Sequence, residues 1–297
     1  GLFAVSGLIC WCGISQVVSN SVSEAFQNAF SIPPLVTTLV LTALAAVIVL
    51  RKEATVKSLD VIVPIMAGCY FVMTLWIILT HLPQLPGVFV RIFSEALGLR
   101  QAVGGGFGAV VMNGIKRGLF SNEAGSGSAP CAAAAAECDD PVKMGLVQAL
   151  GVLIDTIVIC TLTSLAVILS GVLDVGLDSY ATNGAAAVAA FNAILPGTIG
   201  GTIIQISLLF FALSTILGWS YYGERCWAYL SNNNKAVVWI FKVVFVLVCI
   251  VGATGNGTLM WDISDTLNGM MAIPNLIGLL LLSNVIIRST NDYFKKH

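Results

Sequence analysis

The chain has 297 residues, of which 57% are hydrophobic and only 10% are charged, and its mean hydropathy is +0.93. These values exclude an ordinary soluble domain and indicate an integral membrane protein, and the long apolar runs favour helices over barrel strands. The net charge of −1 comes from 14 Lys+Arg against 15 Asp+Glu without a basic patch, so we expect no nucleic-acid partner.

Enzyme chemistry and metal sites find little support in the sequence. The eight cysteines are scattered, mostly inside apolar runs, and form no CxxC pair. His81 ends an apolar segment, His297 is the last residue, and there is no HExxH motif. We therefore predict that the protein is not an enzyme and has neither a zinc site nor a disulfide framework.

The first apolar segment covers residues 1–27 and is interrupted by a polar stretch at 13–21. Gln16 and Asn20 are four residues apart, so a helix places both on one face. Polar residues in the middle of a span face other helices or water, which leaves interhelical hydrogen bonds and ligand contact as two readings. The chain starts at Gly1 without an initiator Met, and we expect an N-terminal part of the protein to precede it.

Two further spans are predicted at residues 35–50 and 61–80. Pro64 falls in the first turn of the latter, where proline is tolerated. A proline-rich stretch at 81–86 then breaks the chain. The amphipathic pattern over 87–99 predicts a short helix lying along the membrane interface.

The fourth predicted span, residues 104–115, opens with three consecutive glycines. Glycine loses the most backbone freedom in a helix, so such a start predicts irregular backbone. A membrane tolerates irregular backbone only where it is buried in protein or lines a wet cavity, which indicates a broken helix at a functional site. The alternative is that the glycines merely let two helices pack closely.

A run of small residues at 124–136 follows Lys116 and Arg117 and is predicted to pack back into the bundle. The fifth span, residues 142–173, carries Asp155 near its middle. An acid at that depth costs at least ~2.5 kcal/mol, so it must face the interior and have a partner. Asp155 is therefore either a functional group or a structural hydrogen-bonding partner of broken backbone.

The sixth predicted span, residues 198–222, follows a short interfacial helix at 185–195 and has a mixed face. Its polar and aromatic residues recur at three- and four-residue steps: Ser207, Phe211, Ser214, Thr215, Gly218, Trp219 and Tyr222. This face either lines a wet path or forms a helix–helix seam. Spans seven and eight are predicted at 236–251 and 267–287, and Pro274 should bend the eighth and expose a carbonyl near Asn275.

Eight spans place the loops alternately on two sides of the membrane. Of the 14 Lys+Arg, only Arg91 and Arg100 fall on one side, so the positive-inside rule makes the other side cytoplasmic. Lys116, Arg117 and Arg288 belong to the cytoplasmic set. We therefore expect a multi-pass protein whose fourth span runs from outside to inside.

The run at residues 118–130, GLFSNEAGSGSAP, resembles the most distinctive motif of the alanine or glycine:cation symporter family, also called sodium:alanine symporters. Three further blocks follow in the order of that family. They are IDTIV at 154–158, STILGWSYYGER at 214–225 and AIPNL at 272–276. The resemblance covers essentially the whole chain.

The resemblance implies an all-α fold similar to the leucine-transporter architecture. That architecture has two five-helix halves in inverted orientation, with broken first and sixth helices at mid-membrane. Residues 1–297 would form one transporter domain with helices three to ten of the core, in which 1–80 complete the first repeat and 102–287 form the second. Helices one and two would precede this chain.

The resemblance also implies a set of binding residues. For the amino acid they are Thr215, Trp219, Gly105, Gly106, Phe107, Gln16 and Asn20. For a sodium ion they are Ser214, Thr215 and Asp155. Gly105, Gly106 and Phe107 would form the unwound part of the sixth core helix. The sequence departs from the family at Val18, where glutamine is common, which leaves the choice of alanine as cargo open.

The implied function is secondary active transport in the bacterial cell membrane. A small neutral amino acid, alanine or glycine, would enter the cell with co-transported sodium by alternating access. The alternatives are proton-coupled symport through Asp155 and, from another class, an amino-acid-gated channel or sensor. Residues 1–297 alone are expected not to transport, because half of each ion site would lie upstream.

Overall fold

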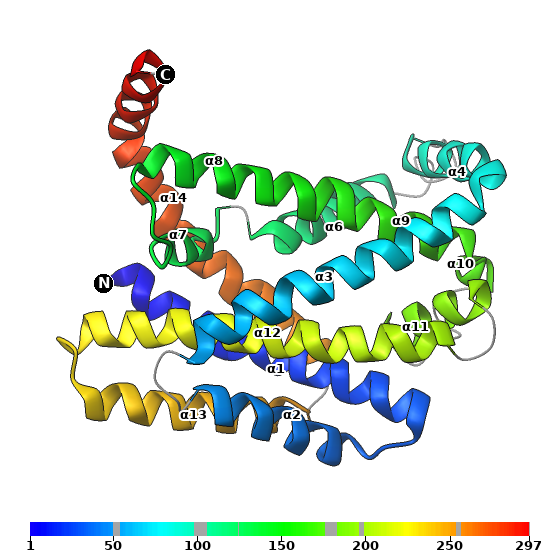
Figure 1. Cartoon of the computed structure of the whole chain (residues 1–297), viewed down its shortest axis with the longest axis horizontal. Helices are drawn as coiled ribbons and strands as arrows, with labels where there is room; N and C mark the ends of the chain where they lie inside the picture. Colours follow the sequence, from blue (N-terminus) through cyan, green and yellow to red (C-terminus); the bar gives the residue numbers. More distant parts are fainter. Residues whose placement is uncertain are drawn as a thin grey trace.

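The structure, a computed structural model, describes residues 1–49, 54–97, 106–123, 125–175, 183–195, 199–253 and 257–296, and every regular element in these ranges is a helix (Figure 1). Gly104 and Gly105 lie outside the described residues, as do the loop charges Arg51, Lys52 and Arg100. The all-α prediction is thus confirmed for the described chain.

Within the described ranges, six helical stretches are long and apolar enough to cross a membrane. They lie in α1 (Leu2–Phe30), α3 (Ala54–Thr80), α8 with η2 and α9 (Pro141–Val152, Leu153–Ile159 and Cys160–Leu169), α12 (Ile199–Leu230), α13 (Lys235–Ala253) and α14 (Gly257–Lys296). These stretches correspond to six of the eight predicted spans.

The other two predicted spans correspond to shorter helices. α2 (Pro34–Val49) is apolar but has 16 residues, and α6 (Gly106–Asn122) has 17. Both fall below the roughly 20 residues that a straight crossing needs. The count of eight spans and the two inverted repeats therefore stay predictions.

α1 lies at the centre of the bundle and contacts α2, α12, α13 and α14 (Figure 1). The polar stretch at residues 13–21 interrupts the apolar run but not the helix, because α1 continues unbroken through it. Its polar side chains Ser15, Ser19, Asn20 and Ser23 are buried against other helices, which confirms that they avoid lipid. Ser23 Oγ, for example, donates to the Ser19 carbonyl at 2.8 Å, so the hydroxyl group is satisfied inside the helix.

One end of the bundle carries the short elements η1 (Leu82–Gln84), α4 (Leu85–Leu97), α10 (Val172–Val175) and α11 (Asn183–Ile194). Arg91 of α4 forms ion pairs with Asp174 of α10 at 2.6 Å and with Glu95 at 2.9 Å. The short helices predicted at 87–99 and 185–195 are therefore present. Their position at a membrane interface remains a prediction.

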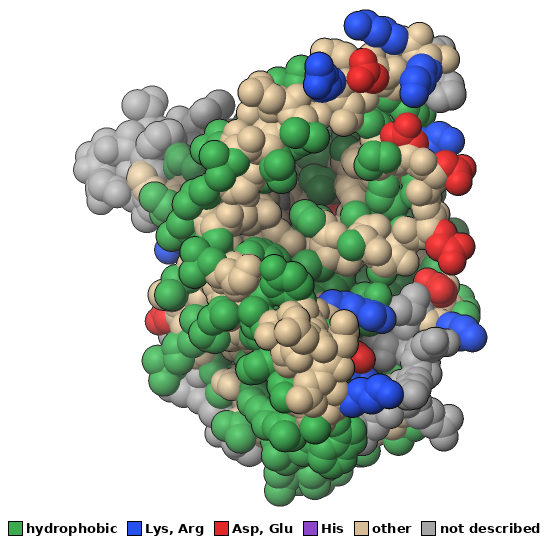
Figure 2. Space-filling model, turned by 90° about the vertical axis from the view of Figure 1, so that its left-hand side faces the viewer, with side chains coloured by type: hydrophobic (Ala, Val, Ile, Leu, Met, Phe, Trp, Pro, Cys, Tyr) green, Lys and Arg blue, Asp and Glu red, His purple; other side chains and the backbone are tan. Residues whose placement is uncertain are grey.

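The opposite end of the bundle is rich in exposed basic side chains, as Figure 2 shows. The start of α8, the end of α12, the start of α13 and the last turns of α14 lie at this end (Figure 1), and their exposed lysines and arginines are Lys143, Arg225, Lys235, Arg288, Lys295 and Lys296. This clustering agrees with the predicted cytoplasmic side. We refer to it below as the basic end.

Arg117 does not lie at the basic end. It pairs with Asp265 of α14 at 2.6 Å, and its guanidinium lies 4.9 Å from the centroid of the Trp261 ring. Asp265 precedes Arg288 by roughly 35 Å along the axis of α14. The prediction that Arg117 lies with Arg288 on the cytoplasmic side is therefore wrong. The reason is that α6 continues to Asn122 instead of ending at residue 115.

Candidate functional site

The described chain leaves the helical conformation between α6 and α7 (Ser128–Ala133). Glu123, Gly125 and Gly127 all adopt left-handed conformations, with φ of 52°, 78° and 98°. Such angles cannot continue a right-handed helix, and at a residue other than glycine they cost on the order of 1–3 kcal/mol. We call residues 123–127 the break.

The break lies within the run at 118–130 and not where it was predicted. Gly106 and Phe107 were expected to be unwound, but both belong to the first turn of α6. Amides of a first turn have no intrahelical partner in any helix, so glycine is least harmful there. Gly105 lies outside the described residues.

Glu123 connects the break to α12. Trp219 Nε1 donates to Glu123 Oε1 at 3.3 Å, and Trp219 is only 6% exposed. The second carboxylate oxygen, Oε2, accepts a hydrogen bond from Ser128 Oγ, at the start of α7. One side chain thus joins both sides of the break to the helix that carries Trp219.

Residues just before the break are bonded to the π-helical segment η2. Ser121 Oγ donates to Asp155 Oδ2 at 2.7 Å, and Asn122 Nδ2 donates to Thr156 Oγ1 at 2.9 Å. The predicted partner of Asp155 is therefore found beside the break. π-Helical turns occur frequently at functional sites, and this one presents two successive side chains to α6.

α14 holds the break from a third direction. Asn275 Nδ2 donates to the Gly125 carbonyl at 2.9 Å. Two features require glycine at position 127. Its φ is positive, and a Cβ atom there would lie 2.4 Å from the Phe3 ring. α14 stays helical through Pro274, and the side chain of Asn275, rather than the carbonyl predicted near it, contacts the break.

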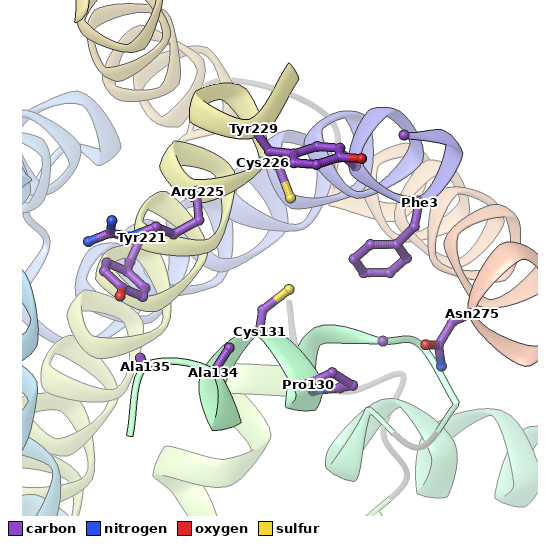
Figure 3. A pocket seen from close by; sticks show the side chains of 13 residues that line it. Phe3, Pro130, Cys131, Ala134, Ala135, Tyr221, Arg225, Cys226, Tyr229 and Asn275 are labelled. Atoms are coloured by element: carbon purple, nitrogen blue, oxygen red, sulfur yellow. The ribbon is translucent and has the colours of Figure 1, made fainter. Parts of the chain in front are cut away.

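A cavity of about 630 Å³ extends from the break toward the basic end (Figure 3). Gly127 and Asn275 line its inner part, whereas Arg225 and Tyr229 are exposed at its outer part. The elements that surround it are the start of α1, α7, the last turns of α12 and the middle of α14. The cavity therefore connects one surface of the bundle with the break.

The remaining predicted site residues have other neighbours. Ser214 and Thr215 are half-buried on α12, about one turn before Trp219, and Ser214 Oγ donates to the Phe211 carbonyl at 2.8 Å. Gln16 packs on α13, where a Cβ atom on Gly252 would lie 2.4 Å from its Cα atom. Asn20 is buried beside Gly257, the first residue of α14.

Sequence reasoning missed Glu123 and Ser128 as a bonded pair. The available signal was a single acid followed by two glycines in a run of small residues, GLFSNEAGSGSAP. An acid in such a run has no local partner of opposite charge, so its carboxylate must find donors elsewhere in the fold.

The matching family model and two similar proteins are all described as symporters. The sequence model described as "Sodium:alanine symporter family" matches residues 1–297. The chain is 42% identical over 293 residues to "Sodium/alanine symporter AgcS" of Methanococcus maripaludis, covering 98% of this chain and 64% of that protein. It is 37% identical over 286 residues to "Probable sodium/glutamine symporter GlnT" of Bacillus subtilis, covering 95% and 58%.

A third relative differs in the coupling ion that its name gives. The chain is 34% identical over 310 residues to "Putative sodium/proton-dependent alanine carrier protein YrbD" of Bacillus subtilis, covering 98% of this chain and 63% of that protein. The chain thus spans less than two thirds of the length of these relatives.

Proposed function

Because the chain belongs to the sodium:alanine symporter family, we propose that its protein carries a small neutral amino acid across the membrane together with sodium. The family and the named relatives are transporters and not enzymes. The observation that carries the proposal is the break at 123–127, which lies against Trp219 and at the inner end of a cavity.

The physical reason lies in the cost of dehydration. A zwitterionic amino acid loses its hydration shell when it enters a protein inside the membrane, so fixed dipoles must replace water. Broken helices supply such dipoles, since their amides and carbonyls no longer all bond within a helix. The left-handed residues of the break have this property, and side chains of α7, α12 and α14 hold them in place.

We assign the pocket and the ion site on α12. Trp219 and Thr215 line the amino-acid pocket, and the indole of Trp219 limits the length of the accepted side chain. An extra methylene then clashes with the ring, whereas a missing one costs only ~1–3 kcal/mol. Ser214 and Thr215 supply hydroxyl oxygens to sodium, which prefers such hard ligands. The cavity provides the route from the break to the cytoplasm.

A proton-coupled cycle through Asp155 is the second candidate. It is favoured by the position of Asp155 beside the break and by a relative whose name includes proton dependence. The substitution Asp155→Asn keeps the hydrogen bond from Ser121 and removes the titrating group. Sodium coupling through Ser214 and Thr215 without Asp155 predicts that this variant keeps its response to a sodium gradient. Sodium coupling with Asp155 as a third ligand predicts a weaker sodium response, and proton coupling predicts that uptake no longer follows pH.

Uptake into proteoliposomes tests the proposal. The whole polypeptide that carries residues 1–297 is reconstituted, and radiolabelled alanine uptake is measured with an inward sodium gradient, with potassium in its place, and with a proton gradient alone. We expect accumulation against the alanine gradient only with sodium, with competition by glycine. Uptake that ignores sodium and follows the proton gradient contradicts sodium coupling, and equilibration without accumulation indicates a channel.

A further inference from the structure

We propose that Glu123 is the positioning residue of Trp219, and that it fixes the orientation of the indole and thereby the size of the side chain that the pocket accepts. This inference rests on the proposed function, because it takes Trp219 as one wall of the amino-acid pocket. It assigns Glu123 no contact with the amino acid or with the ion.

The buried indole N–H of Trp219 needs a hydrogen-bond acceptor. Tryptophan has one polar hydrogen, on Nε1, and can only donate it. Trp219 is buried, and Glu123 Oε1 accepts that hydrogen at 3.3 Å. Trp11, in contrast, is 1% exposed and its Nε1 has no partner in the described part of the chain. Packing alone fixes Trp11, whereas Trp219 is also tied to a polar group.

The carboxylate and the backbone of Glu123 are themselves held in place. Ser128 Oγ donates to its other carboxylate oxygen, and Ser128 is fully buried. The backbone of Glu123 is left-handed, which ordinary chain geometry does not favour, and the Gly125 carbonyl two residues later is held by Asn275. Because Ser128 holds Oε2, the position of Oε1 is defined, and it sets a direction for the indole that a free carboxylate would not define.

The indole of Trp219 requires an acceptor atom on residue 123 but no negative charge. An N–H donor needs an acceptor oxygen and not a charge, so the side-chain carbonyl of glutamine can take the place of Oε1. A proton carrier would require the carboxylate itself. Both oxygens of Glu123 already accept hydrogen bonds from protein groups, which favours positioning over ion binding.

The arrangement also couples the pocket wall to the break. Trp219 belongs to α12, whereas its hydrogen-bond acceptor belongs to the break. A rearrangement of residues 123–127 during alternating access would therefore move the acceptor away from the indole. The pocket wall would be rigid only while the break has the conformation described here.

Transport kinetics of four variants test the proposal in the whole polypeptide. They are Glu123→Gln, Glu123→Ala, Trp219→Phe and the double variant Glu123→Ala with Trp219→Phe. We expect Glu123→Gln to stay within about threefold of the wild-type KM for alanine, and Glu123→Ala to raise it about tenfold, as the loss of one charged hydrogen bond does. Glu123→Ala should also weaken the preference for alanine over glutamine.

The double variant supplies the decisive comparison. Phenylalanine has no N–H, so Glu123→Ala should change KM by less than about twofold once residue 219 is Phe. Full additivity of the two effects overturns the proposal, as does a Glu123→Gln variant that is as impaired as Glu123→Ala. The matched control is Trp11→Phe, which removes an unpaired N–H and should leave the KM for alanine unchanged.

Fluorescence gives a readout that does not depend on transport. For each Glu123 variant, the emission of purified protein is compared with that of the same variant carrying Trp219→Phe, and the difference reports Trp219 alone. We expect Glu123→Ala, but not Glu123→Gln, to shift this difference spectrum. An unchanged spectrum in Glu123→Ala overturns the inference. A wild-type protein without amino-acid uptake would instead refute the proposed function, and the fluorescence result would stand.

Ser128→Ala guards against a folding defect in Glu123→Ala. It removes the second donor to the Glu123 carboxylate and leaves the bond to Trp219 possible. We expect a KM between those of wild type and Glu123→Ala, together with a smaller spectral shift. A Ser128→Ala variant with a normal KM and a normal spectrum contradicts the claim that Glu123 is held at both oxygens.

Discussion

Two polar stretches interrupt the apolar sequence, and only one of them interrupts a helix. The stretch at residues 13–21 in α1 contains glycine, serine, glutamine and asparagine, yet α1 runs through it unbroken. The run at 118–130 has a similar composition and contains the break. Polarity alone therefore does not unwind a helix inside the bundle.

The difference lies in how each stretch uses its glycines and hydroxyl groups. In α1, Gly13 allows close packing, since a Cβ atom there would lie 2.7 Å from the Leu267 side chain. The carbonyl of Ser19 in this stretch accepts a hydrogen bond from Ser23, one turn further along the same helix. In the break, Gly125 and Gly127 provide positive φ angles. Side chains from α12 and α14 then bind the unwound segment.

The largest effect is expected for Gly127→Ala in the break, with Gly13→Ala in α1 as its comparison. Gly127→Ala combines a left-handed φ, worth on the order of 1–3 kcal/mol, with a clash against Phe3. We expect it to abolish sodium-driven alanine uptake and to lower Tm. Gly13→Ala meets only the flexible end of Leu267 and should keep most activity. Equal loss in both variants would contradict the distinction between them.

A thiol bridge across the cavity should give a lasting loss of transport, because the two thioether bonds that form as bromide leaves are not reversed by reducing agents. Cys131 of α7 and Cys226 of α12 face each other there (Figure 3). Dibromobimane, which becomes fluorescent on joining two thiols, should link them and stop alanine uptake, because α7 can no longer move relative to α12. Cys131→Ser and Cys226→Ser should each prevent the fluorescence and the inhibition. A bridged protein that still transports would show that α7 does not move in the cycle.

Removing the support from α14 should have an intermediate effect. Asn275→Ala leaves the Gly125 carbonyl without its donor and should destabilise the protein by about 1–3 kcal/mol, seen as a lower Tm. Asn284→Ala, at an exposed position of the same helix, is the matched control and should leave Tm unchanged. Indistinguishable melting curves for the two variants would show that the bond from Asn275 to the Gly125 carbonyl does not stabilise the protein.

The smallest effect is expected in α1. Ser23→Ala removes a hydroxyl group that bonds the Ser19 carbonyl and lies 2.7 Å from Thr38 Oγ1 of α2. The helix keeps its backbone hydrogen bonds, so we expect a cost of about 1 kcal/mol or less and normal alanine uptake. Loss of uptake in Ser23→Ala would mean that α1 next to the polar stretch, where Ser23 bonds to Ser19, is functional in the same sense as the break.

The sequence sufficed for features that depend on local composition. Hydropathy located six long helices. In the run of small residues, 126–128 are buried whereas 134–136 are exposed, so the described part of the run packs into the bundle only at its start. Asp155 is half-buried and has the hydrogen-bonding partner that an acid within a span requires. The helices and the partner of Asp155 follow from the cost of placing polar groups in hydrocarbon.

The position of the break could not be predicted in the same way. The left-handed residues Glu123 and Gly125 are bonded to Trp219 and Asn275, which lie roughly one hundred residues or more away in the chain, so no local pattern contains these bonds. Three glycines in a row at 104–106 gave a stronger local signal than a single acid in a run of small residues. Arg117 was misplaced because α6 continues to Asn122, and its partner Asp265, which lies in the last helix, could not be read from the local sequence either.

Calorimetric binding of alanine to the whole polypeptide in sodium chloride and in choline chloride tests the central claim most directly, with Trp219→Ala as the comparison. The account predicts that the wild type binds alanine only in sodium and that Trp219→Ala weakens Kd at least about tenfold, the change expected when a buried aromatic contact is lost. Unchanged affinity in Trp219→Ala, or equal binding in choline, would contradict the assignment of the amino-acid site to the break and α12.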